Sequence, residues 1–185
     1  MGLRDDVAKI LIPEDVLQAR VAELGQVINA TYTDADCPLL VCVLKGAFMF
    51  LADLMRHLEV RHAVDFMEIS SYGAGTVSSG VVRILLDLEQ NIERRHVLIV
   101  EDIIDSGRTL DYITRNLRTR NPASLRVCTL LSKPSRREID VPVDLIGFEI
   151  PDEFVMGYGL DFAEEYRNLP FIGVLKEKVY AGNEQ

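Results

Sequence analysis

Three features that mark other classes of protein are scarce or missing in this chain. Its three cysteines include no C-x-x-C pair, so the sequence predicts neither a disulfide framework nor a zinc site. No apolar run reaches the ~20 residues that span a bilayer, and the opening residues lack the charged start and apolar stretch of a secretory signal. We therefore expect a soluble cytoplasmic protein that does not bind a membrane.

Basic charge is also scarce. Lysine and arginine number 20 against 29 acidic residues, which gives a formal net charge of -9. The basic clusters are as short as Arg94-Arg95 and Arg136-Arg137. A general nucleic-acid-binding protein needs a basic face to neutralise phosphates, so we expect no nucleic acid partner. A small anionic substrate is compatible with this charge if local cations or a metal ion offset the repulsive field.

Short apolar runs and amphipathic segments make up most of the chain. Its length and its 48% hydrophobic content suit one domain, 1–185, with a full core. After an N-terminal arm with local pairing, helical periodicity begins at Pro13 and recurs at 46–59 and 111–120. We expect strands at 38–44, 64–70, 81–88, 97–100, 124–132, 144–150 and 171–176. This order predicts an α/β fold with a mostly parallel sheet, in which ligands bind beyond the carboxyl ends of the strands.

The stretch VLIVEDIIDSGRTL, residues 97–110, places chemistry at such an end. Its apolar strand is expected to end near Val100, and the turn DSGRT leads into the next helix. Gly107 permits a tight backbone path, hydroxyls flank it, and the first turn of a helix leaves backbone N–H groups unpaired. These features favour a binding site for one phosphate.

Two acids, Glu101 and Asp102, lie between the strand and this turn. DSGRT alone is explained about equally well by a capped strand-to-helix connection. Adjacent carboxylates at the same strand end change that balance, because carboxylates bind hydroxyl groups and hydrated Mg²⁺ well. A ligand with a terminal phosphate and vicinal hydroxyls, such as ribose 5-phosphate, satisfies both halves.

Residues 97–110 resemble the phosphoribosyl diphosphate (PRPP) signature of the type I phosphoribosyltransferases. The segments VLKGAF, SSYG, LLSKPSRR and GFEIPDEFVMGYGLDFAEEYRNLP resemble the hypoxanthine-guanine branch of that family, from Val43 to Pro170. The resemblance implies a type I phosphoribosyltransferase fold, with a hood built from the N-terminal arm and residues 150–180 and a flexible lid at about 71–80. It also implies a Mg²⁺-dependent transfer from PRPP to a 6-oxopurine base, and a homodimer or homotetramer.

The resemblance also implies the role of each site residue. Asp105 is the catalytic residue, a general base beside N7 of the purine, although its role is equally open to a mainly electrostatic reading. The residues expected to bind PRPP or the nucleotide are Lys45, Gly46, Ser71, Tyr72, Glu101, Asp102, Ile103, Ile104, Asp105, Ser106, Gly107, Arg108, Thr109 and Arg167. Those expected to bind the purine are Lys133, Phe154, Val155 and Asp161, and those expected to hold the metal are Glu101, Asp102 and Asp161.

Base preference is expected to depend on Lys133, which follows a buried strand. Its ammonium only donates hydrogen bonds, so it pairs with the 6-oxo group of hypoxanthine or guanine and meets the amino group of adenine badly. Two alternatives stay open: a xanthine-preferring enzyme, and a nucleotide-sensing RNA-binding regulator on the same fold. The peptide before Lys45 is often cis in the family, which the residues alone do not predict.

Overall fold

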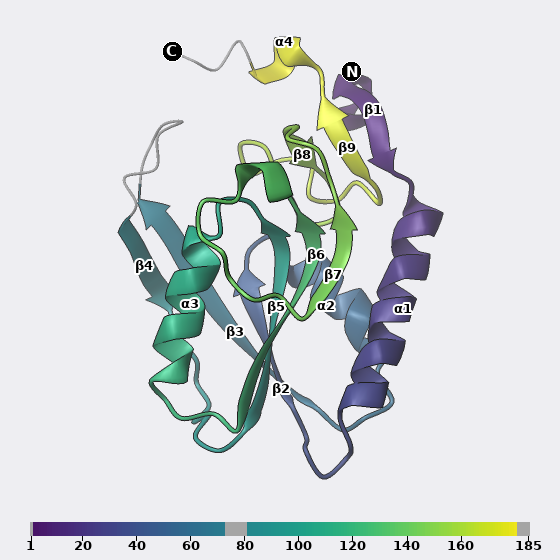
Figure 1. Ribbon diagram of the computed structural model, residues 1–185. Helices are drawn as coiled ribbons and strands as arrows, with labels where there is room; N and C mark the ends of the chain where they lie inside the picture. Colours follow the sequence, from purple (N-terminus) through teal and green to yellow (C-terminus); the bar gives the residue numbers. More distant parts are fainter. Residues whose placement is uncertain (1, 73–80, 181–185) are drawn as a thin grey trace.

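A computed structural model describes residues 2–72 and 81–180 of the chain (Figure 1). Its largest feature is a six-stranded sheet with the strand order β4-β3-β2-β5-β6-β7. Every neighbouring pair is parallel except β3 and β4, which confirms the predicted mostly parallel α/β fold. The strands are β2 (Leu39–Leu44), β3 (Ala63–Tyr72), β4 (Val81–Leu86), β5 (His96–Ile104), β6 (Ser124–Ser132) and β7 (Leu145–Glu149).

Helices cover both faces of this sheet. On one face pack α1 (Glu14–Thr31) and α2 (Phe48–Met55), and on the other packs α3 (Arg108–Arg118) (Figure 1). Side chains of a strand alternate between the faces, so that Leu40 joins the core under α1 and α2 while Leu39 joins the core under α3. β2 and residues 97–100 of β5 are therefore apolar on both faces, as expected for a sheet buried on both sides.

A second, three-stranded antiparallel sheet lies beyond the carboxyl ends of the central strands (Figure 1). It has the order β1-β9-β8, with β1 (Val7–Ile12), β8 (Val155–Met156) and β9 (Ile172–Leu175). Short helical turns flank it and the loop after β6: η1 (Leu3–Asp6), η2 (Pro134–Arg136) and α4 (Glu177–Tyr180). The predicted local pairing of the N-terminal arm is wrong, because Ile12 pairs with Ile172 at the far end of the chain.

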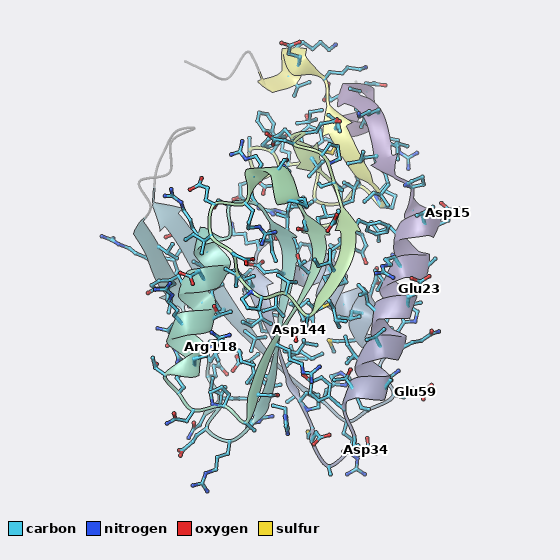
Figure 2. The ribbon with its side chains drawn as sticks, in the orientation of Figure 1. Asp15, Glu23, Asp34, Glu59, Arg118 and Asp144 are labelled. Atoms are coloured by element: carbon cyan, nitrogen blue, oxygen red, sulfur yellow. The ribbon has the colours of Figure 1, made fainter. Side chains whose placement is uncertain are left out.

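Two predicted boundaries also need correction. β5 continues past Val100 to Ile104, because pairing with β6 extends to the Ile104–Ser132 position. The α2 helix begins at Phe48, later than the periodicity suggests. Charged side chains such as Asp15 and Glu23 on α1 project from the outer surface (Figure 2). None of the helices in the described part of the chain combines the length and apolar character needed to cross a membrane.

Candidate active site

The carboxyl end of β5 carries the acid pair. Glu101 pairs in register with Thr129 of β6 and is 6% exposed, while Asp102 accepts a hydrogen bond from the Ile103 N–H at 2.7 Å. Burial, with the neighbouring Asp102 carboxylate, raises the pKa of Glu101 well above its usual value. Burial also raises the pKa of Asp102, to about 6. Hydroxyl donors or a cation close to buried acids of this kind would stabilise their charged form.

The turn after β5 has the geometry of an anion site. Gly107 has a φ of 86° and precedes α3, and a Cβ added to it would lie 2.5 Å from the Ile139 carbonyl oxygen. The Asp111 N–H closes the first helical turn on the Gly107 carbonyl at 2.9 Å, and the Arg108 N–H contacts Ser106 Oγ at 3.4 Å. The N–H groups between them belong to the first helical turn and have no acceptor within the helix, so they can donate to a ligand. A cavity of about 100 Å³ opens here, lined by Glu101, Ile103, Ile104, Asp105, Ser106, Gly107, Thr109 and Leu110.

A larger hollow of about 620 Å³ lies between Val82 of β4 and α3. Its charged groups already pair with one another. Arg108 contacts Glu138 at 2.5 Å, and Arg115 contacts Asp111 at 2.9 Å. The smaller cavity, with its buried acid and helix N-terminus, is therefore the better candidate for substrate chemistry.

The loop after β2 meets the same strand end. The Leu44-Lys45 peptide is cis, and a Cβ at Gly46 would overlap the Asp102 carboxylate. Glycine is therefore required for this close approach. Lys45 Nζ lies 3.2 Å from Glu164 Oε2, which connects the loop to the segment after β8.

That segment, residues 157–169, is called the hood loop below. Arg167 donates to the Gly159 carbonyl at 2.8 Å, contacts Asp161 Oδ1 at 2.9 Å and contacts Glu164 Oε2 at 3.2 Å. The Arg167 guanidinium lowers the pKa of Glu164. A Cβ at Gly159 would overlap the Gly46 carbonyl oxygen, so the two loops touch through their backbones. The structure thus brings Lys45, Gly46, Asp161 and Arg167 together.

Asp105 lies at the mouth of the cavity and accepts a hydrogen bond from Arg136 Nε at 2.9 Å. Arg136 also lies 3.6 Å from Asp152 Oδ2, and Lys133 Nζ lies 3.8 Å from Asp152 Oδ1. Lys133 is only 7% exposed, and its backbone N–H donates to the Ile104 carbonyl at 2.9 Å. The backbone of Lys133 therefore lies beside the end of β5, while its buried ammonium is directed at Asp152.

The expected purine wall lies partly in the second sheet. Val155 begins β8 and is 6% exposed. Phe154 is 48% exposed and meets Phe162 edge to face, with ring centroids 5.6 Å apart. An aromatic ring this exposed offers a face on which a flat ligand can stack.

The expected lid lies largely outside the described residues. Ser71 and Tyr72 end β3, where their backbones pair with Val82 and Val81. Their side chains, and residues 73–80, are not described.

The acids expected to hold a metal do not form a closed cluster. Within residues 2–72 and 81–180, no three acidic, histidine or cysteine side chains gather closely enough to hold a metal ion by themselves. Asp161 is paired with Arg167 and does not complete a metal-binding cluster with the acid pair on β5. The donor set nonetheless fits Mg²⁺, which is usually bound through one or two carboxylates together with substrate phosphates and water.

Three charged residues join the site without having been predicted in it. Glu164 lies in a segment that is not helical and contacts both Lys45 and Arg167. Arg136 and Asp152 contact the two residues expected at the purine, Asp105 and Lys133. Their only signal in the sequence is that Arg136 lies within the KPSRR segment and Asp152 within the IPDEF segment.

Comparisons with known proteins agree with this geometry. Residues 14–163 match the family model described as the phosphoribosyl transferase domain. The hypoxanthine-guanine phosphoribosyltransferase of Bacillus subtilis strain 168 is 52% identical over 178 residues, covering 96% of this chain and 98% of the relative. The hypoxanthine phosphoribosyltransferase of Escherichia coli K12 is 55% identical over 166 residues, covering 89% and 93%. A crystal structure of the Staphylococcus aureus hypoxanthine phosphoribosyltransferase superposes with a TM-score of 0.92 at 44% identity, covering 96% of each chain.

Proposed function

Because the chain belongs to the phosphoribosyl transferase family, we propose that it transfers the 5-phosphoribosyl group of PRPP to N9 of hypoxanthine or guanine. The products are IMP or GMP and pyrophosphate, so the chain is a purine salvage enzyme. Relatives that carry this activity in their names are 52% and 55% identical over most of the chain.

The observation that carries the proposal is the joint between β5 and α3. An acid pair suited to ribose hydroxyls and a turn suited to the 5-phosphate stand at the two ends of one short stretch, Glu101 to Thr109. Ribose 5-phosphate carries its vicinal hydroxyls at one end and its phosphate at the other. The acid pair can accept hydrogen bonds from the hydroxyls while the turn donates to the phosphate, which supports PRPP as the ligand.

The reaction breaks the bond from the anomeric carbon to the diphosphate and forms a bond from that carbon to N9. Positive charge develops on the ribose ring, and the carboxylates Glu101, Asp102 and Asp105 favour it. Asp105 accepts the proton that the purine must lose, at N7. Lys133 donates to the 6-oxo oxygen, while Phe154 stacks on the ring and the Val155 backbone meets its pyrimidine edge.

The diphosphate lies, in this proposal, between Lys45-Gly46 and Arg167. Mg²⁺, when bound, would neutralise negative charge on the diphosphate and make it a better leaving group. It would also offset the repulsion between the diphosphate and a chain of net charge -9. Glu101, Asp102 and Asp161 would hold the ion together with PRPP oxygens. Arg167 supplies a fixed positive charge on the same side.

The test is formation of IMP from hypoxanthine and PRPP with Mg²⁺, compared between the natural chain and Asp105→Asn. We expect the substitution to lower kcat by about 10² to 10⁴-fold, because general-base help and cation stabilisation are both lost. The KM values should change little, because the amide keeps the shape of the carboxylate. An unchanged kcat would show that Asp105 has been given the wrong role.

Two rivals predict other outcomes. A xanthine-preferring enzyme would turn over xanthine best under the same conditions. An RNA-binding regulator would shift RNA in electrophoresis at physiological salt and show no PRPP-dependent turnover. The homodimer or homotetramer stays a prediction, which the molar mass in solution by light scattering would test.

A further inference from the structure

The hood loop contains an unusual backbone path at Tyr158. Three consecutive residues have positive φ angles: 98° at Gly157, 50° at Tyr158 and 100° at Gly159. Glycine adopts such angles freely, but a tyrosine does so at a free-energy cost because of its Cβ. Contacts of the Tyr158 side chain therefore have to hold this turn in place.

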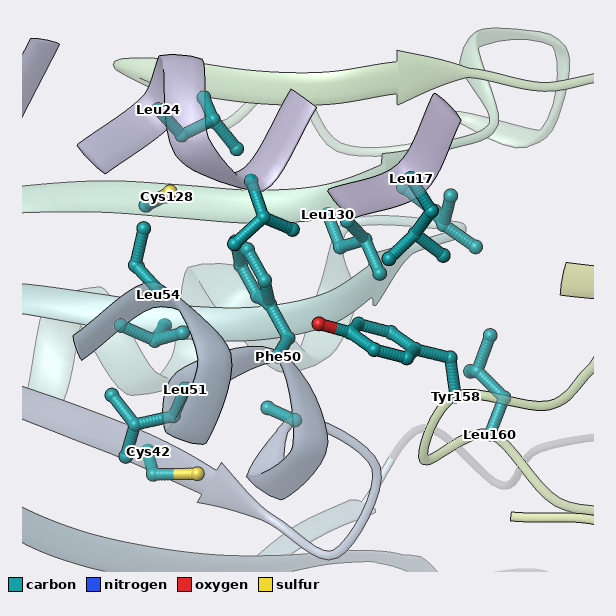
Figure 3. Close-up of a cluster of buried hydrophobic side chains, with 14 of the residues drawn as sticks. Leu17, Leu24, Cys42, Phe50, Leu51, Leu54, Cys128, Leu130, Tyr158 and Leu160 are labelled. Atoms are coloured by element: carbon teal, nitrogen blue, oxygen red, sulfur yellow. The ribbon is translucent and has the colours of Figure 1, made fainter. Parts of the chain in front are cut away.

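Those contacts lead to the two helices on the other side of the loop. The Tyr158 hydroxyl donates to Asp53 Oδ2 at 2.7 Å, and Gln18 Nε2 donates to the same oxygen at 2.8 Å. Asp53 lies on α2 and Gln18 on α1. The Tyr158 ring is 2% exposed and reaches toward Phe50 between Leu17 and Leu160 (Figure 3). The hydroxyl thus joins the hood loop to both helices under an apolar cover.

The turn that Tyr158 holds is part of the diphosphate side of the site. Gly159 exchanges two hydrogen bonds with Arg167: its N–H donates to the Arg167 carbonyl at 2.9 Å, and its carbonyl accepts from the Arg167 side chain at 2.8 Å. Gly159 also presses on the Gly46 carbonyl. Because α2 begins two residues after Gly46, Asp53 and Gly46 belong to one short stretch of chain. The position of Tyr158 therefore sets the position of Arg167 relative to Lys45-Gly46.

We propose that the Tyr158–Asp53 hydrogen bond is a positioning contact that aligns Arg167 and Gly46 for the diphosphate of PRPP. Tyr158 acts through Gly159 and touches no substrate. The inference rests on the proposed function and adds to it a residue pair behind the site, the buried Tyr158 and the partly exposed Asp53. The purine side, built from Lys133 and β8, does not depend on this contact.

The test uses Tyr158→Phe, which keeps the ring and removes the hydroxyl. We expect the KM for PRPP to rise about 5- to 20-fold, the range expected from losing one positioning hydrogen bond. The KM for hypoxanthine should stay within about twofold, since the purine wall is untouched. The affinity for PRPP with Mg²⁺, measured by titration calorimetry, should fall in parallel.

Two further variants test the hydrogen bond itself. Asp53→Asn keeps an oxygen that accepts from both Tyr158 and Gln18, so its KM for PRPP should stay near that of the natural chain. Asp53→Ala removes the acceptor and should behave like Tyr158→Phe. If the asparagine variant instead matched the alanine variant, the hydrogen bond would not be the operative feature.

The same loop provides a matched control in Tyr166. Its hydroxyl donates to Asp6 Oδ2 at 3.0 Å, its side chain is 5% exposed and its φ is 72°. This bond holds the hood loop to the N-terminal segment, away from Gly46. Tyr166→Phe should lower the melting temperature about as much as Tyr158→Phe and leave the KM for PRPP within about twofold.

The outcomes separate the two proposals. If Tyr166→Phe raises the KM for PRPP as much as Tyr158→Phe does, the effect is a general loosening of the hood loop, and the positioning role is overturned. If the natural chain is active and Tyr158→Phe leaves the KM for PRPP unchanged, only the positioning role is overturned. Absence of PRPP turnover in the natural chain would instead count against the proposed function.

Discussion

The central sheet and the hood loop face each other across the site, and they are stabilised in different ways. Buried apolar side chains on both faces hold the sheet: Leu40 of β2 and Val100 of β5 are fully buried, as is Phe50 of the covering helix α2. The hood loop buries fewer side chains, Tyr158 and Leu160 among them, and polar contacts such as those of Arg167 hold its exposed part. Within it Tyr158, Ala163, Glu164 and Tyr166 all have positive φ angles. The sheet supplies fixed positions at its carboxyl edge, whereas the loop supplies charges aimed at that edge. A substitution in the sheet should therefore change stability, and one in the loop should change substrate binding.

The largest effect is expected from the sheet side. Leu24→Ala removes a buried side chain of α1 from the core under α1 and α2 and should lower the free energy of unfolding by about 2 to 5 kcal/mol. Urea denaturation followed by circular dichroism measures this loss. The KM values of the remaining folded protein should be near normal, and a selective rise in the KM for PRPP would break the proposed division of roles.

On the loop side, Arg167→Gln should leave the free energy of unfolding within about 1 kcal/mol, because the ion-pair partners of Arg167, Asp161 and Glu164, are 31% and 67% exposed and water screens both pairs. The KM for PRPP should rise about 10- to 100-fold, because charge-assisted hydrogen bonds to the diphosphate are lost. Steady-state kinetics with PRPP varied at saturating hypoxanthine provide the measurement. Equal rises in the KM values for PRPP and hypoxanthine would contradict the assignment of the hood loop to PRPP binding alone.

Asp102 lies where the two regions meet, and its pH dependence gives a smaller effect. Burial raises its pKa to about 6 in the folded chain, above the roughly 3.9 of an unfolded aspartate. The folded state then binds the proton more tightly, so the contribution of Asp102 to stability falls as pH rises from about 4 to 6 and stays low above that window.

Asp102→Asn should therefore raise the stability of the substrate-free protein at pH 7, by on the order of 1 kcal/mol. Thermal melts in EDTA from pH 4 to 8 measure this difference. The melting temperature of the variant should fall less between about pH 4 and 6 than that of the natural chain. If the variant were less stable than the natural chain at pH 7, the Asp102 carboxylate would stabilise the fold, and the account of it as an unfavourable buried charge would be wrong.

The two regions also differ in how far the sequence predicts them. The strand at 124–132 was predicted to the residue, because a short, mostly apolar segment between turns is typical of a buried strand. The extension of β5 to Ile104 was missed, since Glu101 and Asp102 break the apolar pattern while pairing with β6 maintains the strand. The spacing of apolar residues in a strand carries no information about how far a neighbouring strand pairs with it.

Prediction was weakest in the hood loop. The resemblance placed Asp161 and Arg167 at the site, but nothing in residues 157–169 predicts the run of positive φ angles or the contact of Glu164 with Lys45. Both depend on segments that are distant in the sequence. Pairing between β1 and β9 escaped prediction for the same reason.

The most direct test of the central claim, that this chain is a 6-oxopurine phosphoribosyltransferase, is kcat/KM for hypoxanthine, guanine, xanthine and adenine with PRPP and Mg²⁺. We predict that hypoxanthine or guanine is the best substrate and that adenine is used poorly, because the buried Lys133 ammonium can only donate to the 6-position. Adenine as the best substrate, or no turnover with any of the four bases, would contradict the claim.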